Sequence, residues 1–272
     1  MNLPETKNLL LNFDKGVLHV TLNRPESRNA MSAGMVADLN TVFDSIQGER
    51  EVRVVVLRGA GGNFCAGADL KEVMASGGLK PPAPGETDPI VGFSRGFGSL
   101  LRKVTNLHAV VVAVCEGAVL AGGFGFACVS DIALAHVDAK FGVPETTRGL
   151  PPAQIAPFIV ERIGLTQARR LCLTGAMFRG AEALKLGIVH DIFSSDEELQ
   201  AKLGEVIKQI LNCAPSANAI TKEIVLKVGK QDMDTVLDDA AQKFAACVRG
   251  PEAPEGIAAF MQKRAPKWAQ QS

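Results

Sequence analysis

The sequence predicts an α/β protein, because runs typical of buried strands alternate with a stretch of helical periodicity. Three short runs, Val52–Leu57, Val110–Val114 and Asp131–Ala135, are rich in Val, Leu and Ala, the composition of strands that are buried on both faces. Between residues 35 and 46, apolar residues recur every three or four positions, which is the period of a helix. Strands that alternate with helices along a chain are typical of α/β folds.

The N-terminal elements follow from local patterns. Leu9–Phe13 and Val17–Leu22 are short apolar runs that an Asp-Lys-Gly tripeptide separates, and this pattern predicts a β-hairpin. Ser32 precedes the helical stretch and is a residue type that caps helix N-termini.

Residues 75–92, rich in Gly, Pro and Ala and without periodicity, predict a mobile loop that could cover a site.

Past residue 196 the strand-like runs end and helical stretches follow. They lie at 197–213, 217–228 and 233–248, with a last turn at 254–263. We therefore divide the chain into a core of residues 1–196, which holds the site, and a helical section of residues 197–272. The apolar faces of this section suit packing on another subunit, although packing on the chain's own core fits the same pattern.

Composition argues against several classes of function. The 272 residues carry 29 Lys and Arg against 29 Asp and Glu, so the net charge is zero, whereas binding to nucleic-acid phosphates needs a basic surface. The six cysteines and four histidines are scattered, without CxxC or HExxH spacing. We therefore expect no metal site, and we interpret the cysteines as buried free thiols in a reducing compartment.

Two further patterns bear on localisation. The N-terminus lacks the basic stretch and long apolar core of a secretory signal. The apolar stretch from Ala109 to Val129 contains Glu116 and several glycines, so a buried strand-turn-helix explains it better than a membrane span. We expect a soluble, cytoplasmic protein.

One familiar motif is rejected on its context. Gly92–Gly96 matches GxSxG, but a nucleophile elbow needs a buried strand before it, and the preceding residues are a Pro-rich stretch. Ser94 is therefore not expected to be a nucleophile. The chain has neither a GxGxxG dinucleotide fingerprint nor a GxxxxGK[ST] phosphate loop.

Two segments, Phe64–Asp69 and Leu120–Gly125, each bring a strand-like run into small residues and then open a helix. Such a turn leaves backbone N–H groups unpaired at a helix N-terminus, where the helix dipole favours negative charge. Two such groups that converge on one oxygen form an oxyanion hole, although the glycines suit tight packing equally well. Glu145, which follows Pro144 at a strand-to-helix junction, becomes a candidate acid/base if it lies beside these turns.

Seven segments of the chain match the motifs of one known family in order and spacing. They are Asn23–Pro25, Asn29–Ala30, Ala66–Leu70, Val114–Gly123, Asp131–Ala135, Phe141–Glu145 and Phe260–Arg264. Through them the chain resembles the enoyl-CoA hydratase/isomerase (crotonase) superfamily over nearly its whole length. The resemblance implies a spiral of ββα units and a helical C-terminal trimerisation section, usually assembled as trimers or dimers of trimers.

The resemblance also implies roles for single residues. The backbone amides of Ala68 and Gly122 would hold the thioester oxygen of an acyl-CoA substrate, and Glu145 would move protons at its α-carbon. CoA is then part of the substrate, and no separate cofactor is implied. Phe260 and Lys263 match positions that reach the CoA of a neighbouring subunit. The other positions implied to bind substrate or CoA are Arg28, Ala66, Asp69, Leu70, Lys71 and Gly125.

One position departs from the common pattern of the family. Hydratases with two glutamates carry the first of them three residues after the oxyanion glycine, where this chain has Gly125, and the second where it has Glu145. Ordinary hydration of short enoyl-CoA thioesters is then in doubt. Isomerases that shift a double bond, and some hydratase-lyases, manage with the single glutamate.

A narrower resemblance favours one branch of the family. Residues 149–160 and the ending at 263–268 look like those of bacterial methylglutaconyl-CoA and isohexenylglutaconyl-CoA hydratases, and residues 117–131 look closer to the latter. This implies a lyase that adds water across the double bond of a branched 3-substituted glutaconyl-CoA in acyclic terpene catabolism. Gly125 would leave room for the branched chain. Arg148 could pair with the distal carboxylate of such a substrate, although a surface role suits an arginine better.

Other functions stay open at this point. Within the family they are a 3-methylglutaconyl-CoA hydratase of leucine breakdown and a Δ3,Δ2-enoyl-CoA isomerase. From another class, a nucleic-acid-binding or scaffold role on the same fold is the alternative, and the neutral charge counts against it.

Overall fold

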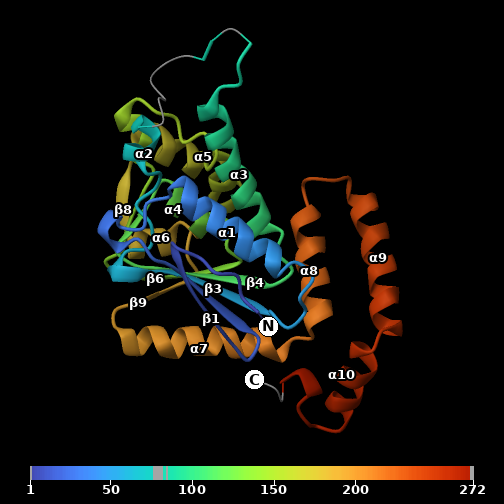
Figure 1. Ribbon diagram of the computed structural model, residues 1–272. Coiled ribbons are helices and arrows are strands. Elements are labelled where there is room, and N and C mark those ends of the chain that lie inside the picture. The colour runs from blue at the N-terminus through green and yellow to red at the C-terminus, as the bar shows by residue number, and fades with distance from the viewer. Residues whose placement is uncertain (1, 76–81, 84, 270–272) are drawn as a thin grey trace.

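The computed structural model describes residues 2–75, 82–83 and 85–269 (Figure 1). Its strands are β1 Leu9–Asp14, β2 Val17–Leu22, β3 Val54–Gly59, β4 Val110–Cys115, β5 Ala118–Leu120, β6 Ile132–His136, β7 Lys140–Gly142, β8 Met177–Arg179 and β9 Asp191–Phe193. Across these residues, one sheet has the order β1-β2-β3-β4-β6-β9 and a smaller one the order β5-β7-β8. The predicted hairpin is confirmed, because β1 and β2 pair antiparallel, and every later pair in the larger sheet is parallel.

Helices lie between the strands, so the predicted α/β class is confirmed. They are α1 Ala33–Ser45, α2 Leu70–Ala75, α3 Pro89–Thr105, α4 Gly122–Val129, α5 Ala156–Thr174, α6 Gly180–Lys185, α7 Asp196–Asn212, α8 Pro215–Lys227, α9 Met233–Arg249 and α10 Glu252–Met261, with short 3-10 helices at Pro25–Ser27, Ala60–Gly62, Pro144–Arg148 and Lys267–Ala269. The predicted cap of α1 is confirmed, since the Ser32 hydroxyl accepts a hydrogen bond from the Met35 N–H over 3.0 Å.

The central strands β3 and β4 of the larger sheet are buried on both faces, as their apolar sequences predict. In β3, Val55 and Leu57 belong to the main core, whereas Val54 and Val56 face the other way and pack in a second cluster. This alternation follows from the two-residue period of a strand. Leu199 and Leu203 of α7 are members of the second cluster, so α7 covers that face of the sheet. The main core lies on the opposite face, with α1 and α3 (Figure 1).

The chain repeats one unit: a strand of the larger sheet, then a strand of the smaller sheet, then a helix. β4 in the larger sheet is followed by β5 in the smaller sheet and then by α4, while β6 is followed by β7 and then by the 3-10 helix at 144–148. After β3, Cys65 forms a parallel bridge with Val119 of β5, as a strand of the smaller sheet would. The units run parallel, and equivalent turns therefore lie next to one another.

The predicted loop at 75–92 is partly wrong. Residues 76–81 and 84 lie outside the described residues, but α3 begins at Pro89 and therefore takes the last part of this stretch. The Asp88 side chain accepts a hydrogen bond from the Ile90 N–H over 2.8 Å, and Pro89 occupies the first helical turn, where it needs no hydrogen-bond partner. Gly92–Gly96 lies inside α3, after its first turn, and the described residues directly before α3 form no strand, so the GxSxG pattern does not sit on a strand-to-helix elbow.

The helical C-terminal stretches are confirmed as α7 to α10, and they differ in their packing. α7 lies along the larger sheet, whereas α8, α9 and α10 extend to one side of the core (Figure 1). The division of the chain at residue 196 stays a prediction. Helix α7, which follows this residue, packs on the sheet of the core.

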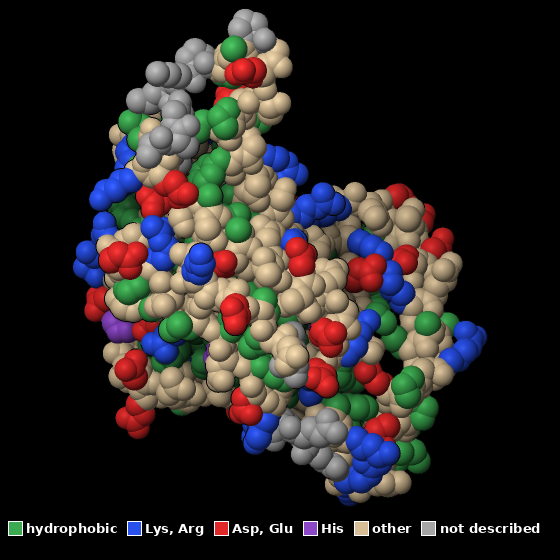
Figure 2. All heavy atoms as spheres, in the orientation of Figure 1, with side chains coloured by type: hydrophobic (Ala, Val, Ile, Leu, Met, Phe, Trp, Pro, Cys, Tyr) green, Lys and Arg blue, Asp and Glu red, His purple; other side chains and the backbone are tan. Residues whose placement is uncertain are grey.

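Surface charge and cysteine placement complete the description. On the face shown in Figure 2, basic and acidic side chains are interspersed. In the described part of the chain, no helix has the length and apolar character to cross a membrane, and no group of three or more His, Cys, Asp or Glu could hold a metal. The cysteines carry free thiols, and Cys65, Cys115 and Cys128 are buried. Cys213 is exposed, which corrects the interpretation of the cysteines as uniformly buried.

Candidate active site

The two glycine turns lie against each other. The Leu120 N–H donates to the Cys65 carbonyl over 2.9 Å, and the Cys65 N–H donates to the Ala118 carbonyl over 2.8 Å, so the segment after β3 runs beside β5. Gly67 has a φ of +100°, and a Cβ at this position would lie 2.7 Å from the Cβ of Ala121. A side chain at position 67 would therefore force the two turns apart.

Two backbone amides, those of Ala68 and Gly122, follow directly after these turns. Gly122 is the first residue of α4, where N–H groups have no partner within the helix. Neither amide donates a hydrogen bond to another residue in the described ranges. Ala121 has a φ of 48° and a ψ of −115°, a strained conformation of the kind that clusters at functional sites. Two unpaired donors on adjoining turns are what an oxyanion hole requires.

A mostly apolar cavity of about 360 Å³ opens beside the two amides. Helix α3 contributes Ile90, Phe93 and Phe97 to its wall, and a Cβ at Gly122 would lie 3.0 Å from the tip of the Phe97 ring. The other lining residues are Met31, Val36, Ala66, Ala68, Leu70, Ser94, Ala121, Gly122, Glu145, Arg148, Leu150, Pro151, Pro152, Ala153, Gln154 and Ile155. This size and polarity suit an organic ligand with an apolar portion.

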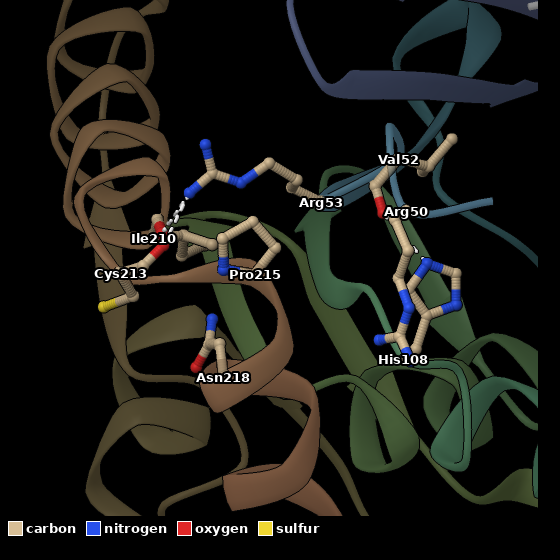
Figure 3. A pocket seen from close by; sticks show the side chains of 8 residues that line it. All are labelled: Arg50, Val52, Arg53, His108, Ile210, Cys213, Pro215 and Asn218. Carbon is tan, nitrogen blue, oxygen red and sulfur yellow. Dashed lines mark hydrogen bonds between the residues drawn. The ribbon is translucent and has the colours of Figure 1, made fainter. Parts of the chain in front are cut away.

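A second hollow, drawn in Figure 3, is far smaller and is not a substrate site. It measures about 10 Å³, which leaves room for roughly one water molecule. Arg53, directly before β3, points across this hollow toward the end of α7. Its guanidinium donates hydrogen bonds to the carbonyls of Leu211 and Cys213 over 2.7 and 2.6 Å. A guanidinium at this place satisfies the last carbonyls of α7, which is a structural role.

Glu145 lies in the 3-10 helix that follows β7. Because β7 pairs parallel with β5, with Phe141 opposite Val119, the residues after β7 adjoin the turn after β5. The Oε2 oxygen of Glu145 is buried and has no hydrogen-bond partner among the described residues. Burial raises the pKa of the Glu145 carboxyl, and the positive charge of Arg148 partly opposes that rise. A buried carboxyl of raised pKa that lines a cavity is a candidate acid/base.

Known proteins resemble this chain over nearly its whole length. The sequence profile of the family described as enoyl-CoA hydratase/isomerase matches residues 12–271. The chain belongs to this family. The fold is shared with an enoyl-CoA hydratase/isomerase from Marinobacter aquaeolei, which is 52% identical, with a TM-score of 0.93 over 96% of this chain and 99% of that one.

Two further relatives span the same length. Pseudomonas aeruginosa AtuE has a TM-score of 0.93 and 50% identity over 97% of this chain and 100% of its own. The short-chain-enoyl-CoA hydratase of Clostridium acetobutylicum is 30% identical over 96% of this chain and 97% of its own. The superfamily and the crotonase fold predicted from the sequence motifs are thus confirmed.

The residues implied to bind CoA in this family have different surroundings. Ala66 and Leu70 line the cavity, and Lys71 is exposed on α2 beside them. The Asp69 carboxylate accepts a hydrogen bond from the Arg24 guanidinium over 2.9 Å, and the same guanidinium donates to a neighbouring carbonyl over 2.8 Å. Asp69 therefore holds the turn in place, a contact that sequence reasoning missed.

The remaining implied CoA residues do not line the cavity of this chain. The exposed Arg28 has a left-handed backbone, and its carbonyl accepts a hydrogen bond from the Ala66 N–H over 3.0 Å. Phe260 is 84% exposed at the end of α10, which lies far from α2 and α3 in Figure 1, and Lys263 follows it. Their implied role at a neighbouring subunit stays a prediction.

The room expected at Gly125 is not open space. A Cβ at this position would lie 2.7 Å from the Ile155 Cγ2 and 3.2 Å from the Leu101 Cδ1, and Gly125 is not among the residues that line the cavity. The Ile155 side chain fills the space beside Gly125, and Ile155 does line the cavity. The expectation that glycine itself leaves room for a branched chain is corrected accordingly.

Sequence reasoning also missed much of the cavity wall. The predicted loop at 75–92 includes the first turn of α3 and with it Ile90, although Asp88 and Pro89 together are a helix-start signal. No pattern marked Phe93 or Phe97, farther along α3, as part of the wall. Gln154 and Ile155 lie just before α5 in a Pro-rich stretch without periodicity, so no local pattern marked them.

Proposed function

We propose that the chain is a hydratase that adds water across the double bond of a branched 3-substituted glutaconyl-CoA. The observation that carries this proposal is the unpartnered Glu145 oxygen in a cavity that also adjoins the amides of Ala68 and Gly122. A base and two converging donors are the groups that thioester enolate chemistry needs.

The proposed reaction needs two backbone amides and one carboxylate, which acts first as a base and then as an acid. The thioester oxygen accepts hydrogen bonds from the amides of Ala68 and Gly122, which draws electrons from the conjugated double bond. The Glu145 carboxylate removes a proton from water as the hydroxyl adds to the β-carbon, and an enolate forms. Glu145 then delivers that proton to the α-carbon, and the double bond is saturated. No electrons leave the substrate, so the step needs no redox cofactor.

The cavity supports the proposed substrate class in two ways. Arg148 lines it, so a cation is available for the distal carboxylate of a glutaconyl thioester. The apolar wall of Ile90, Phe93 and Leu150 can bury a branched hydrocarbon tail. Of the two glutaconyl thioesters, the isohexenylglutaconyl thioester has the longer hydrocarbon tail, so this apolar wall favours it. The 3-methylglutaconyl thioester stays the alternative within this class.

The second candidate is a Δ3,Δ2-enoyl-CoA isomerase. Of the described residues that line the cavity, Glu145 alone carries a carboxylate. Moving one proton between two carbons needs a single base, whereas hydration must also hold a water molecule.

Oligomerisation is part of the proposal. Exposed apolar side chains on the C-terminal helices, among them Leu237, Phe244 and Ile257, support their packing on other subunits. We propose a homo-oligomer, a trimer or a dimer of trimers.

The test is to assay the purified protein with a panel of acyl-CoA thioesters. Turnover is measured as the change in absorbance of the conjugated thioester. The panel contains crotonyl-, 3-methylglutaconyl- and isohexenylglutaconyl-CoA, and a 3-enoyl-CoA read as an absorbance gain. Preferential loss of absorbance with the long branched glutaconyl thioester supports the proposal. Inactivity with the glutaconyl thioesters, together with turnover of the 3-enoyl thioester, refutes it in favour of the isomerase.

Glu145→Gln tests the mechanism. The amide keeps the shape of the carboxylate but cannot transfer the proton, so we expect kcat to fall by about 10²–10⁴-fold while CoA thioester binding is retained. Glu205→Gln on the exposed side of α7 is the matched control. Near-normal hydration by Glu145→Gln would contradict the mechanism.

A further inference from the structure

A second polar side chain, Gln154, lines the cavity just before α5. Its amide oxygen lies against Gly98 of α3, where a Cβ would overlap it, so the glycine makes room for the amide. Gln154 is half-buried, yet it makes no hydrogen bond to any residue in the described ranges. The amide of this half-buried side chain is therefore free to bond to a water molecule, and Gln154 shares the cavity with Glu145.

The same segment covers position 125. A Cβ at Gly125 would point at the Ile155 side chain, with its Cγ2 only 2.7 Å away. Gln154 is the preceding residue, so the segment that fills the space over Gly125 also places a glutamine in the cavity wall. Ser94 on α3 is polar as well, but a helical serine hydroxyl can bond to a carbonyl of its own helix.

We propose that Gln154 is the water-positioning residue of the hydration, and this inference rests on the proposed function. The attacking water has two hydrogens. One passes to the Glu145 carboxylate as the oxygen adds to the β-carbon, and the other is held by the Gln154 amide oxygen. The amide is not basic, so it orients the water without taking its proton. A single glutamate and a neutral amide then do what two carboxylates would do.

Two reactions separate this role from a structural one. Hydration of 3-methylglutaconyl-CoA needs Glu145, the two amides and a held water molecule. Exchange of the α-proton of 3-methylglutaryl-CoA in D2O needs Glu145 and the amides only, because this saturated thioester cannot add water. The ratio of the two rates therefore reports the water position and is insensitive to a general loss of folded enzyme.

The variants are Gln154→Leu, which removes the acceptor, and Gln154→Glu, which keeps an acceptor oxygen. We expect Gln154→Leu to lower the kcat of hydration by about 10–100-fold, the effect of one lost hydrogen bond to the reacting water, while α-proton exchange changes by less than about threefold. Gln154→Glu should hydrate within about tenfold of the wild type. Gln209→Leu on the exposed face of α7 is the matched control.

Each outcome decides the matter. Parallel changes of hydration and exchange in Gln154→Leu, or no change in either, overturn the role of Gln154 even if the wild type hydrates well. A Gln154→Glu variant as poor in hydration as Gln154→Leu, with exchange intact, also overturns it. Exchange without any hydration by the wild type refutes the proposed function itself, and the water-positioning role falls with it.

Discussion

Replacing Gly67 by alanine tests whether the contact between the two glycine turns builds the site. The new Cβ would lie 2.7 Å from the Cβ of Ala121 and 3.3 Å from the Leu120 carbonyl oxygen, on a backbone with a φ of +100°. Gly62 is the matched control, because its φ is +70° and nothing lies within 4 Å of an added Cβ. Both substitutions strain the backbone, but only Gly67→Ala pushes the turns apart.

The expected magnitudes follow from these two effects. An alanine at positive φ costs about 1–2 kcal/mol of folding free energy, and this is the whole cost at Gly62. At Gly67 the overlap with Ala121 adds about 1–3 kcal/mol, so the total is about 2–5 kcal/mol. At about 2–4 °C per kcal/mol, Gly67→Ala should melt at least several degrees below the wild type and below Gly62→Ala. Displacing the Ala68 amide should also lower kcat by about 10²–10³-fold.

The assay combines calorimetric melting with kcat on the preferred acyl-CoA, measured well below the Tm of each variant. Gly62→Ala should keep kcat within about threefold of the wild type. Suppose that Gly67→Ala has the same Tm as Gly62→Ala and the kcat of the wild type. The turns are then not held by this contact, and the assignment of the Ala68 amide to the oxyanion hole is refuted.

Two further outcomes concern charge. In the proposed mechanism Glu145 is a carboxylate base, so kcat/KM should fall as the pH falls through the pKa of Glu145, which burial raises above the ordinary carboxyl value and the Arg148 charge partly lowers. Arg148→Ala should move this acidic limb to higher pH and raise KM for glutaconyl thioesters but not for crotonyl-CoA. An unmoved limb with unchanged KM would contradict the placement of Arg148. Lys222 of α8 donates to the Asp131 carboxylate and is only 10% exposed, so Lys222→Met should lower the free energy of unfolding by about 1.5–3 kcal/mol, seen in calorimetry. Lys227→Met, which disrupts surface ion pairs, is the control with the smaller loss, and equal losses would show that the Lys222 contact is no stronger than a surface pair.

Much of the secondary structure could be predicted because local patterns determine it. The β-branched runs of β3 and β4 and the Ser32 cap of α1 each act through neighbours a few residues away. The start of α3 was missed where its signal, Asp88 followed by Pro89, was read as part of a Pro-rich loop. Ile90, in the first turn of that helix, was consequently missed as part of the cavity wall.

The contacts between distant segments had no local signal. Nothing near Asp69 in the sequence marks Arg24 as its partner, and nothing near Gly125 marks Ile155 as the residue that fills its space. Each of these contacts joins residues 30 or more positions apart, and each depends on how the units of the fold stack.

The sequence by itself determined the family and the α/β class, and it predicted residues for the reaction, because motifs such as residues 66–70 and Glu145 keep their spacing along the chain. Only the tertiary structure decided that the Ala68 and Gly122 turns adjoin, that the Oε2 oxygen of Glu145 is buried and unpartnered, and which side chains line the cavity. The physical reason is that burial, and with it the raised pKa of Glu145, arises from packing between parallel units far apart in sequence, which no local pattern contains.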